Sequence, residues 1–248
     1  MKRSGMKNEI TLAKEKFAVV LKTRSPKEAA DFFEVIVSTK NDHFGKELLR
    51  GVPALNLAGI LREFDVSSPT IISGLVFPEQ VAQIFEIEPL YWSIGVFPEF
   101  LEKECLVIRE GAKTLIFSLL GWENDDRRAE ILQAVVSNKA ALNYLALPFI
   151  ISDKDNDNSK DVIDEEEEDV PGLFCWDRAD LVDGSLEDLW DIIQRASPEA
   201  AEKITRLIEQ GNGKKITLSG YIRRLRRDAL KRVKRPKKLV EAFEPLNL

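Results

Sequence analysis

The residues with the greatest capacity for chemistry in this sequence are cations, and they gather near its C-terminal end. Residues 211–238 contain twelve lysines and arginines and a single acid, Asp228. Arginine suits phosphate because its planar guanidinium donates hydrogen bonds as a fork. The segment 217–235 contains no Asn or Gln that would read bases, so we predict non-specific contact with a nucleic-acid backbone. The predicted contact residues are Lys214, Lys215, Arg223, Arg224, Arg226, Arg227, Lys231, Arg232, Lys234 and Arg235.

An amphipathic helix would present these cations. Between residues 218 and 233 apolar side chains recur every three or four positions, which is the spacing of one helix face. The stripe predicts a helix that docks on the rest of the chain and turns its arginines outward, and Pro236 would end it. Three other occupants stay open: an acidic protein, an anionic membrane or calmodulin-like groove, and the chain's own acids. The membrane or groove is disfavoured because no Trp or Phe lies within 214–238.

A second charged block lies upstream and is acidic. Residues 153–169 contain ten acids and two lysines, and the whole chain has a net charge of −6 despite its basic end. Such a segment buries too little apolar surface to offset the entropy of ordering, so we predict a solvated linker. Its oxygen-bearing side chains also follow a calcium-loop spacing, but Asn158 stands where the loop needs glycine and Asp164 where it needs glutamate. We therefore predict no metal site and no cofactor. The residues at that spacing are Asp153, Asp155, Asp157, Ser159, Asp161 and Asp164.

Catalysis by a nucleophile or a metal has little to build on. The chain has two cysteines, Cys105 and Cys175, and one histidine, His43. This set is too small for a four-cysteine zinc site, a two-histidine mechanism or a disulfide framework. No phosphate-binding glycine loop, dinucleotide fingerprint or serine elbow is present. We predict a protein that is not an enzyme. An enzyme with carboxylates or a cysteine brought together from distant sequence is the second alternative.

Tyr91 and Trp92 are candidates for a protein-interaction patch. Exposed tyrosine and tryptophan often anchor interfaces. The competing interpretation is core packing, which the general burial of large aromatic side chains favours.

The elements that must position these residues are predicted to be helices. Residues 25–28 (Ser-Pro-Lys-Glu) combine a capping serine, a first-turn proline and a capping-box glutamate. Phe-Pro-Glu occurs at 77–79 and again at 97–99, and each would open a further helix. This twenty-residue echo makes a short solenoid an alternative to a bundle. No alternation of strands and helices is visible, so the predicted fold class is mainly α. Apolar periodicity predicts later helices over 125–147, 185–196, 198–210 and 217–235.

The acidic segment divides the chain into three predicted parts. Residues 1–152 would form a helical N-terminal domain, 153–170 an acidic linker, and 171–248 a small helical C-terminal region that ends in the basic helix. The longest uncharged runs have thirteen residues, whereas a membrane-spanning helix needs about 20. We expect an intracellular protein, cytoplasmic or, in a eukaryote, nuclear. We expect it to act as a non-enzymatic adaptor or regulator. The main alternative is a structural subunit whose acidic and basic blocks pair with each other or with a partner.

Overall fold

Helices form the regular structure of the described part of the chain. The computed structural model describes residues 2–64, 70–92, 98–121, 123–150, 186–212 and 217–232. No strand occurs in these ranges, and the predicted mainly α fold class is confirmed. The α-helices are α1 (Lys2–Thr23), α2 (Pro26–Ser38), α3 (Asp42–Leu49), α4 (Ala54–Leu61), α5 (Pro78–Ile87), α6 (Pro98–Leu120), α7 (Asp125–Ser137), α8 (Lys139–Leu145), α9 (Leu186–Ala196), α10 (Pro198–Asn212) and α11 (Leu218–Arg232), and the short 3₁₀ helices are η1 (Ser73–Leu75), η2 (Glu88–Tyr91) and η3 (Leu147–Phe149).

Several helices begin at the residues that local sequence signals predict. The Ser25 hydroxyl accepts a hydrogen bond from the Glu28 amide and the Glu28 carboxylate accepts one from the Ser25 amide, so a capping box starts α2. The two Phe-Pro-Glu sequences also precede helices, since α5 begins at Pro78 and α6 at Pro98. These helices have 10 and 23 residues. The echo therefore marks two helix starts in elements of different length.

The helix predicted over 125–147 is wrong in one respect, because it is two helices. Asn138 separates α7 from α8, and its Oδ1 accepts hydrogen bonds from the amides of Ala140 (3.0 Å) and Ala141 (3.3 Å). Its Nδ2 donates to Glu86 Oε2 on α5 at 2.7 Å. Asn side chains compete with the helix ladder in this way and so favour caps over helix interiors.

One continuous apolar core joins helices from both sides of the acidic segment. The central helix α5 packs against α4, α7 and α8, while α9 packs against α7 and α6, and α11 packs against η2, α6 and α8. Ile193 of α9, Ile204 of α10 and Ile222 of α11 are buried in the same cluster as Ile84 of α5. The helices after residue 185 thus share their core with those before residue 150. The predicted linker 153–170, with the calcium-loop spacing of Asp153–Asp164, lies outside the described residues.

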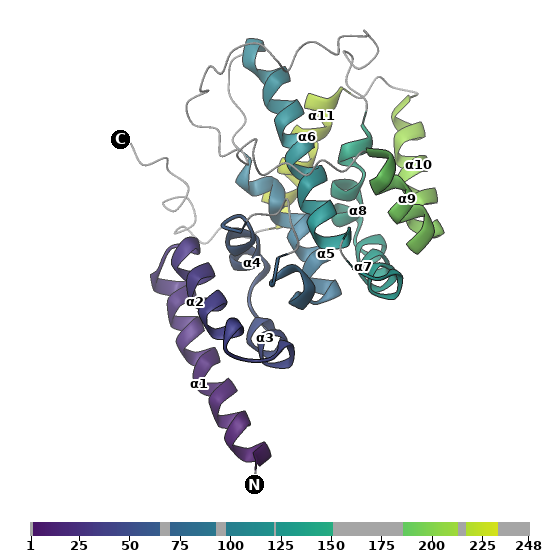
Figure 1. The fold of residues 1–248 in the computed structure, drawn as a ribbon. Coiled ribbons are helices and arrows are strands. Elements are labelled where there is room, and N and C mark those ends of the chain that lie inside the picture. The colour runs from purple at the N-terminus through teal and green to yellow at the C-terminus, as the bar shows by residue number, and fades with distance from the viewer. Residues whose placement is uncertain are drawn as a thin grey trace.

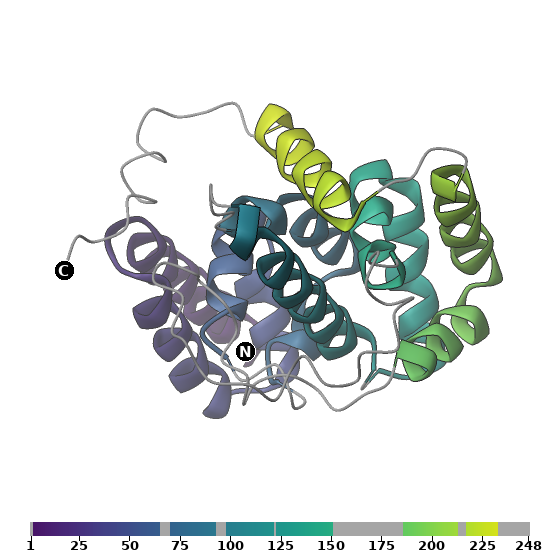
Figure 2. The same cartoon turned by 90° about the horizontal axis from the view of Figure 1, so that it is seen from above.

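The helices are arranged along an elongated body. Helices α1 and α2 lie at one end, and α9 and α10 lie at the other (Figures 1 and 2). In Figure 2, α11 lies along the upper edge of the body, above the helices that it packs on. This placement leaves one long side of α11 facing away from the protein.

Candidate nucleic-acid interface

The inward side of α11 fastens the helix to the core. The Thr217 hydroxyl accepts a hydrogen bond from the Gly220 amide at 3.2 Å and so caps the first turn. The Tyr221 hydroxyl donates to the main-chain oxygen of Asn143 on α8 at 2.8 Å. Burial raises the pKa of Tyr221 to about 12, while the neighbouring Arg224 opposes that rise. The buried stripe consists of Leu218, Tyr221, Ile222, Leu225 and Ala229.

The outward side of α11 carries arginines that have few partners among the described residues. Arg223 is exposed and Arg226 half-buried, and neither has an ion pair or side-chain hydrogen bond within the described ranges. Arg227 follows Arg223 by one turn, and 65% of its side chain is exposed. Leu230, which is 43% exposed, lies one turn beyond Arg226. The result is a strip of three arginines on two successive turns, two of them exposed and one half-buried.

Other predicted contact residues already bind neighbours in the protein. Arg232 Nη1 lies 2.8 Å from Glu86 Oε1, the carboxylate whose second oxygen accepts from Asn138. Lys231 Nζ lies 3.4 Å from Asp228 Oδ1, which is also 4.0 Å from Arg227 Nε. Both pairs with Asp228 are exposed, and such pairs contribute little to stability.

Arg224 takes a distinct place on the flank of α11. Its guanidinium lies over the Tyr221 ring, 4.6 Å from the ring centroid. A guanidinium attracted to the face of an aromatic ring loses conformational freedom without losing its charge. Arg224 is therefore held in a fixed position beside the outward strip. The four remaining predicted contacts, Lys214, Lys215, Lys234 and Arg235, lie outside the described residues.

The structure puts Tyr91 and Trp92 against the core. Trp92 is 5% exposed and stacks on Tyr144, which in turn stacks on Phe85. The Tyr91 hydroxyl donates to the main-chain oxygen of Leu55 at 2.6 Å. Core packing, the competing interpretation of this pair, describes these positions. Tyr91 and Trp92 form no exposed aromatic patch among the described residues.

A buried ion pair lies beside these aromatic residues, and no sequence motif predicts it. Arg62 follows α4 and Glu88 opens η2, and Arg62 Nη1 donates to Glu88 Oε1. The Arg62 guanidinium also lies 5.1 Å from the centroid of the Tyr91 ring. Burial raises the pKa of the Glu88 carboxyl, and Arg62 opposes the rise. Burial raises the pKa of Tyr91 as well. The pair joins two elements that are 26 residues apart, and no motif links them.

Within the described ranges, His43 and Cys105 are not assembled into a catalytic site. His43 is exposed on α3, whereas Cys105 is 2% exposed within α6. Cys175 lies outside the described residues. No cluster of three or more histidine, cysteine or carboxylate side chains that could hold a metal ion occurs in the part of the chain described here. Across the same ranges, the helices are all too short or too polar to cross a membrane.

Comparison with known proteins gives two matches. Residues 78–213 match the family described as the AtcB C-terminal domain. The chain is also 30% identical over 165 residues to "Adaptation to cold protein B" of Shewanella oneidensis, a match that covers 64% of this chain and 63% of that protein. The chain thus spans less than two thirds of the length of this relative. No solved structure matches the chain.

Proposed function

The chain belongs to the AtcB C-terminal domain family, and we propose that it is a non-catalytic adaptor whose helix α11 contacts the phosphate backbone of a nucleic acid. The observation that carries the proposal is the outward strip of Arg223, Arg226 and Arg227 on a helix whose opposite side is buried. The family match covers residues 78–213, and α11 follows directly after it. A nucleic-acid partner would place the protein inside the cell.

The chemistry of the strip favours contact with phosphate over reading of bases. Three guanidinium groups on two turns can each bind one phosphate as a fork. The residues of α11 include no Asn or Gln, so discrimination among bases would be weak. Binding would therefore depend steeply on salt, because each phosphate contact releases condensed counterions.

The test is fluorescence anisotropy of labelled single-stranded and duplex oligonucleotides across a salt series. Point variants are needed, because a chain that ends before α11 would also lose Tyr221 and Ile222 from the core. For Arg223→Gln/Arg227→Gln we expect weaker binding to every sequence. We also expect the negative slope of log affinity against log salt to become shallower by about 2 on duplex DNA.

The matched control changes the same net charge on another helix. Lys203 and Arg206 of α10 already pair with Glu199 and Glu202, so Lys203→Gln/Arg206→Gln should leave the affinity and the slope unchanged. Absence of binding to any oligonucleotide at low salt would refute the proposal. Equal losses of affinity in the two double variants would also refute it, because the loss would then depend only on net charge and not on the position of the arginines.

The acidic segment supplies a natural competitor for the same strip. Residues 153–169 carry ten acids on the same chain as α11, so their carboxylates and a nucleic acid would compete for the arginines. Removal of 153–169 should therefore tighten oligonucleotide binding. Unchanged or weaker binding of this shortened chain would exclude the competition and leave the α11 site standing.

A structural role is the second candidate, and a specific contact favours it. Arg232 of α11 pairs with Glu86 of α5, so at least one cation of the basic helix serves the fold. If the outward arginines serve a protein interface instead, reversing their charge (Arg223→Glu/Arg227→Glu) would dissociate a complex or lower the melting temperature. Nucleic-acid affinity would be absent from the start.

The name of the relative suggests when such an adaptor would act. "Adaptation to cold protein B" describes a role in cold, and we propose the same setting for this chain. In its own host, loss of the gene should slow growth at low temperature and not at the optimum. The intact gene should restore growth in the cold, and the Arg223→Gln/Arg227→Gln variant should fail to do so.

A further inference from the structure

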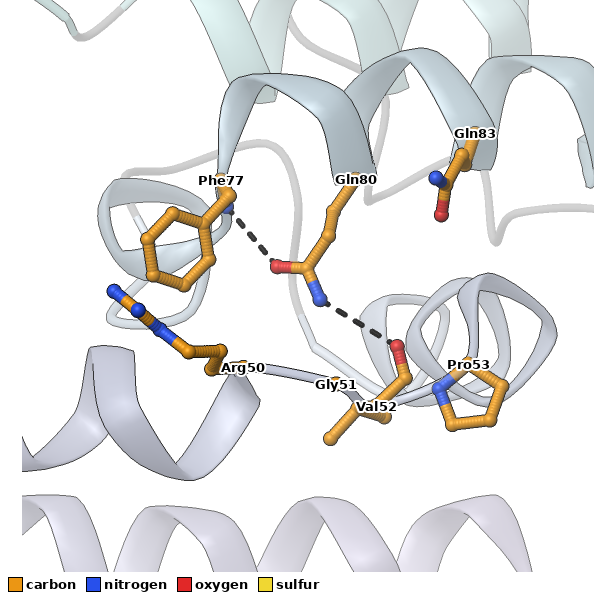
Figure 3. Close-up of a pocket in the computed structure, with 7 residues that line it drawn as sticks. All are labelled: Arg50, Gly51, Val52, Pro53, Phe77, Gln80 and Gln83. Atoms are coloured by element: carbon orange, nitrogen blue, oxygen red, sulfur yellow. Dashed lines mark hydrogen bonds between the residues drawn. The ribbon is translucent and has the colours of Figure 1, made fainter.

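A pocket of about 380 Å³ lies where the connection between α3 and α4 meets the start of α5 (Figure 3). Its walls come from Arg50 to Pro53 on one side and from Phe77 to Gln83 on the other. The volume falls at the lower end of the range for ligand sites in proteins. It is open to solvent, so it has room for a small part of a larger molecule and does not enclose a whole ligand.

The pocket is preformed, because hydrogen bonds of the Gln80 side chain join the residues of its floor. The Gln80 side chain is 8% exposed. Its Nε2 donates to the main-chain oxygens of Leu49 (3.0 Å) and Val52 (3.4 Å), and its Oε1 accepts from the Phe77 amide at 3.1 Å. Figure 3 shows the bonds of Gln80 to Phe77 and Val52, and the second of these joins the two walls. A site that is already ordered loses little conformational entropy when it binds.

The rim of the pocket has the cation of Arg50 on one side and the primary amide of Gln83 on the other. The Arg50 guanidinium lies 5.0 Å from the centroid of the Phe77 ring, and its Nη2 is 3.1 Å from Glu47 Oε1. Glu47 also pairs with Lys14 at 3.2 Å, so one carboxylate is shared by two cations and a positive charge is left over. Gln83 is exposed and has no side-chain partner in the described ranges. Figure 3 draws Arg50 and Gln83 on opposite sides of Gln80.

We propose that this pocket binds an acidic, leucine-like stretch of extended peptide from a partner protein. A carboxylate of the peptide would meet the fork of Arg50, which the Phe77 ring holds in place. An aliphatic side chain would lie against Phe77, Val52 and Pro53. The primary amide of Gln83 would bond the main chain of the peptide, donating to a C=O or accepting from an N–H.

A peptide fits these walls better than a phosphate does. The pocket itself contains one cation, and Glu47 beside it repels a doubly charged phosphate more than a single carboxylate. Most of the remaining surface is apolar, as a side-chain pocket requires. This site goes beyond α11 and shares no residue with it, so an adaptor could use the two independently.

The test is an NMR titration of the full ¹⁵N-labelled chain with two capped hexapeptides. One alternates leucine with aspartate, and its twin alternates leucine with asparagine. We expect the acidic peptide to shift the Gly51, Phe77 and Gln83 signals and to saturate in the millimolar range or below. The twin should bind about ten-fold more weakly, since it lacks the charge-assisted hydrogen bond.

Variants separate this site from the basic helix and from general electrostatics. Arg50→Gln should abolish the preference for the acidic peptide at an unchanged melting temperature. Arg24→Gln, which removes an exposed arginine paired with Glu28 on α2, should preserve the preference, and so should Arg223→Gln/Arg227→Gln. Equal affinity for the twins, shifts confined to α11, or tighter pocket binding by inorganic phosphate would each overturn the proposal. None of these results decides whether α11 binds nucleic acid.

Discussion

At the scale of single residues, the most consequential side chain is the buried carboxylate of Glu88. It is 1% exposed, and while Oε1 accepts from Arg62, Oε2 has no hydrogen-bond partner among the described residues. A buried charge is tolerated only with compensation, and here that compensation is partial. Burial accordingly raises the pKa of Glu88 above its ordinary value of 4.5.

The raised pKa makes a prediction about pH. A carboxyl whose pKa is higher in the folded protein binds more protons when folded, so its contribution to stability falls as the pH rises through and above 4.5. Glu88→Gln cannot ionise and lacks this fall. The free energy of unfolding of the variant, minus that of the wild type, should therefore increase from about pH 4 to about pH 8 in urea titrations. A decrease over the same range would mean that attraction to Arg62 exceeds the cost of burial.

Gly51 shows a backbone requirement within the proposed peptide pocket. Its φ of +85° lies in the left-handed region, and a Cβ there would meet nothing within 4 Å. Gly51→Ala should therefore lower the free energy of unfolding by about 1 kcal/mol through backbone strain alone. Gly74→Ala is the matched control, because its Cβ would make only an ordinary contact with Glu123 at 3.6 Å. Chemical denaturation of both variants measures the difference, and equal stabilities would contradict the assignment of strain.

The residue-scale features could be predicted only where chemistry follows local sequence. The cations of α11 were found from their spacing, because one amphipathic helix sets which side each residue occupies. The Arg62–Glu88 pair could not be found, because it depends on how α4 meets η2. Trp92 was ambiguous for the same reason: its type fits either an interface or a core, and only its neighbours Phe85 and Tyr144 decide.

At the scale of elements, helix starts were predictable and the helix break at Asn138 was not. Serine caps and first-turn prolines act within four residues, so the sequence around residues 25, 78 and 98 was sufficient. The apolar pattern of 125–147 runs on through Asn138, whose side chain caps α8 and also bonds Glu86 across the fold. Apolar periodicity alone cannot distinguish a residue that caps one helix and contacts another element from a residue inside one continuous helix.

The double role of Asn138 can be measured against a cap of the same type. Asn138→Ala removes the cap of α8 and the hydrogen bond to Glu86, and should cost about 2 kcal/mol of stability. Asn124→Ala removes only the cap of α7, where Oδ1 accepts from the Arg127 amide at 2.9 Å, and should cost about 1 kcal/mol. Equal losses in thermal or urea unfolding would mean that the contact with Glu86 contributes nothing.

At the scale of the whole molecule, the main finding is a core shared across the acidic segment. The sequence shows that α9, α10 and α11 each have an apolar face, but not which helices those faces cover. A composition break as sharp as residues 153–169 usually separates domains. Here Leu189 and Ile193 of α9 are buried in the same cluster as Leu132 and Val135 of α7. The charge of residues 153–169 does not predict this packing.

A shared core predicts one cooperative unfolding transition. Trp92 lies beside α8, and Trp190 of α9 packs edge-on against Phe149. In variants that keep one of these tryptophans and carry phenylalanine at the other three positions, the fluorescence midpoints should coincide. They should also match the midpoint of far-ultraviolet circular dichroism. An earlier transition at Trp190 would instead divide the molecule into two separately stable units.

The continuity of this core also changes what the main chain between residues 150 and 186 is needed for. Ile150 and Leu189 are each buried on the same body, so the two halves are held by packing as well as by the peptide bonds between them. If the gene were split within that stretch, the two polypeptides would each expose an apolar face that only the other can cover. Coexpressed, they would reassemble as a heterodimer with the fold of the unbroken chain, and the protein would become a two-part complementation system.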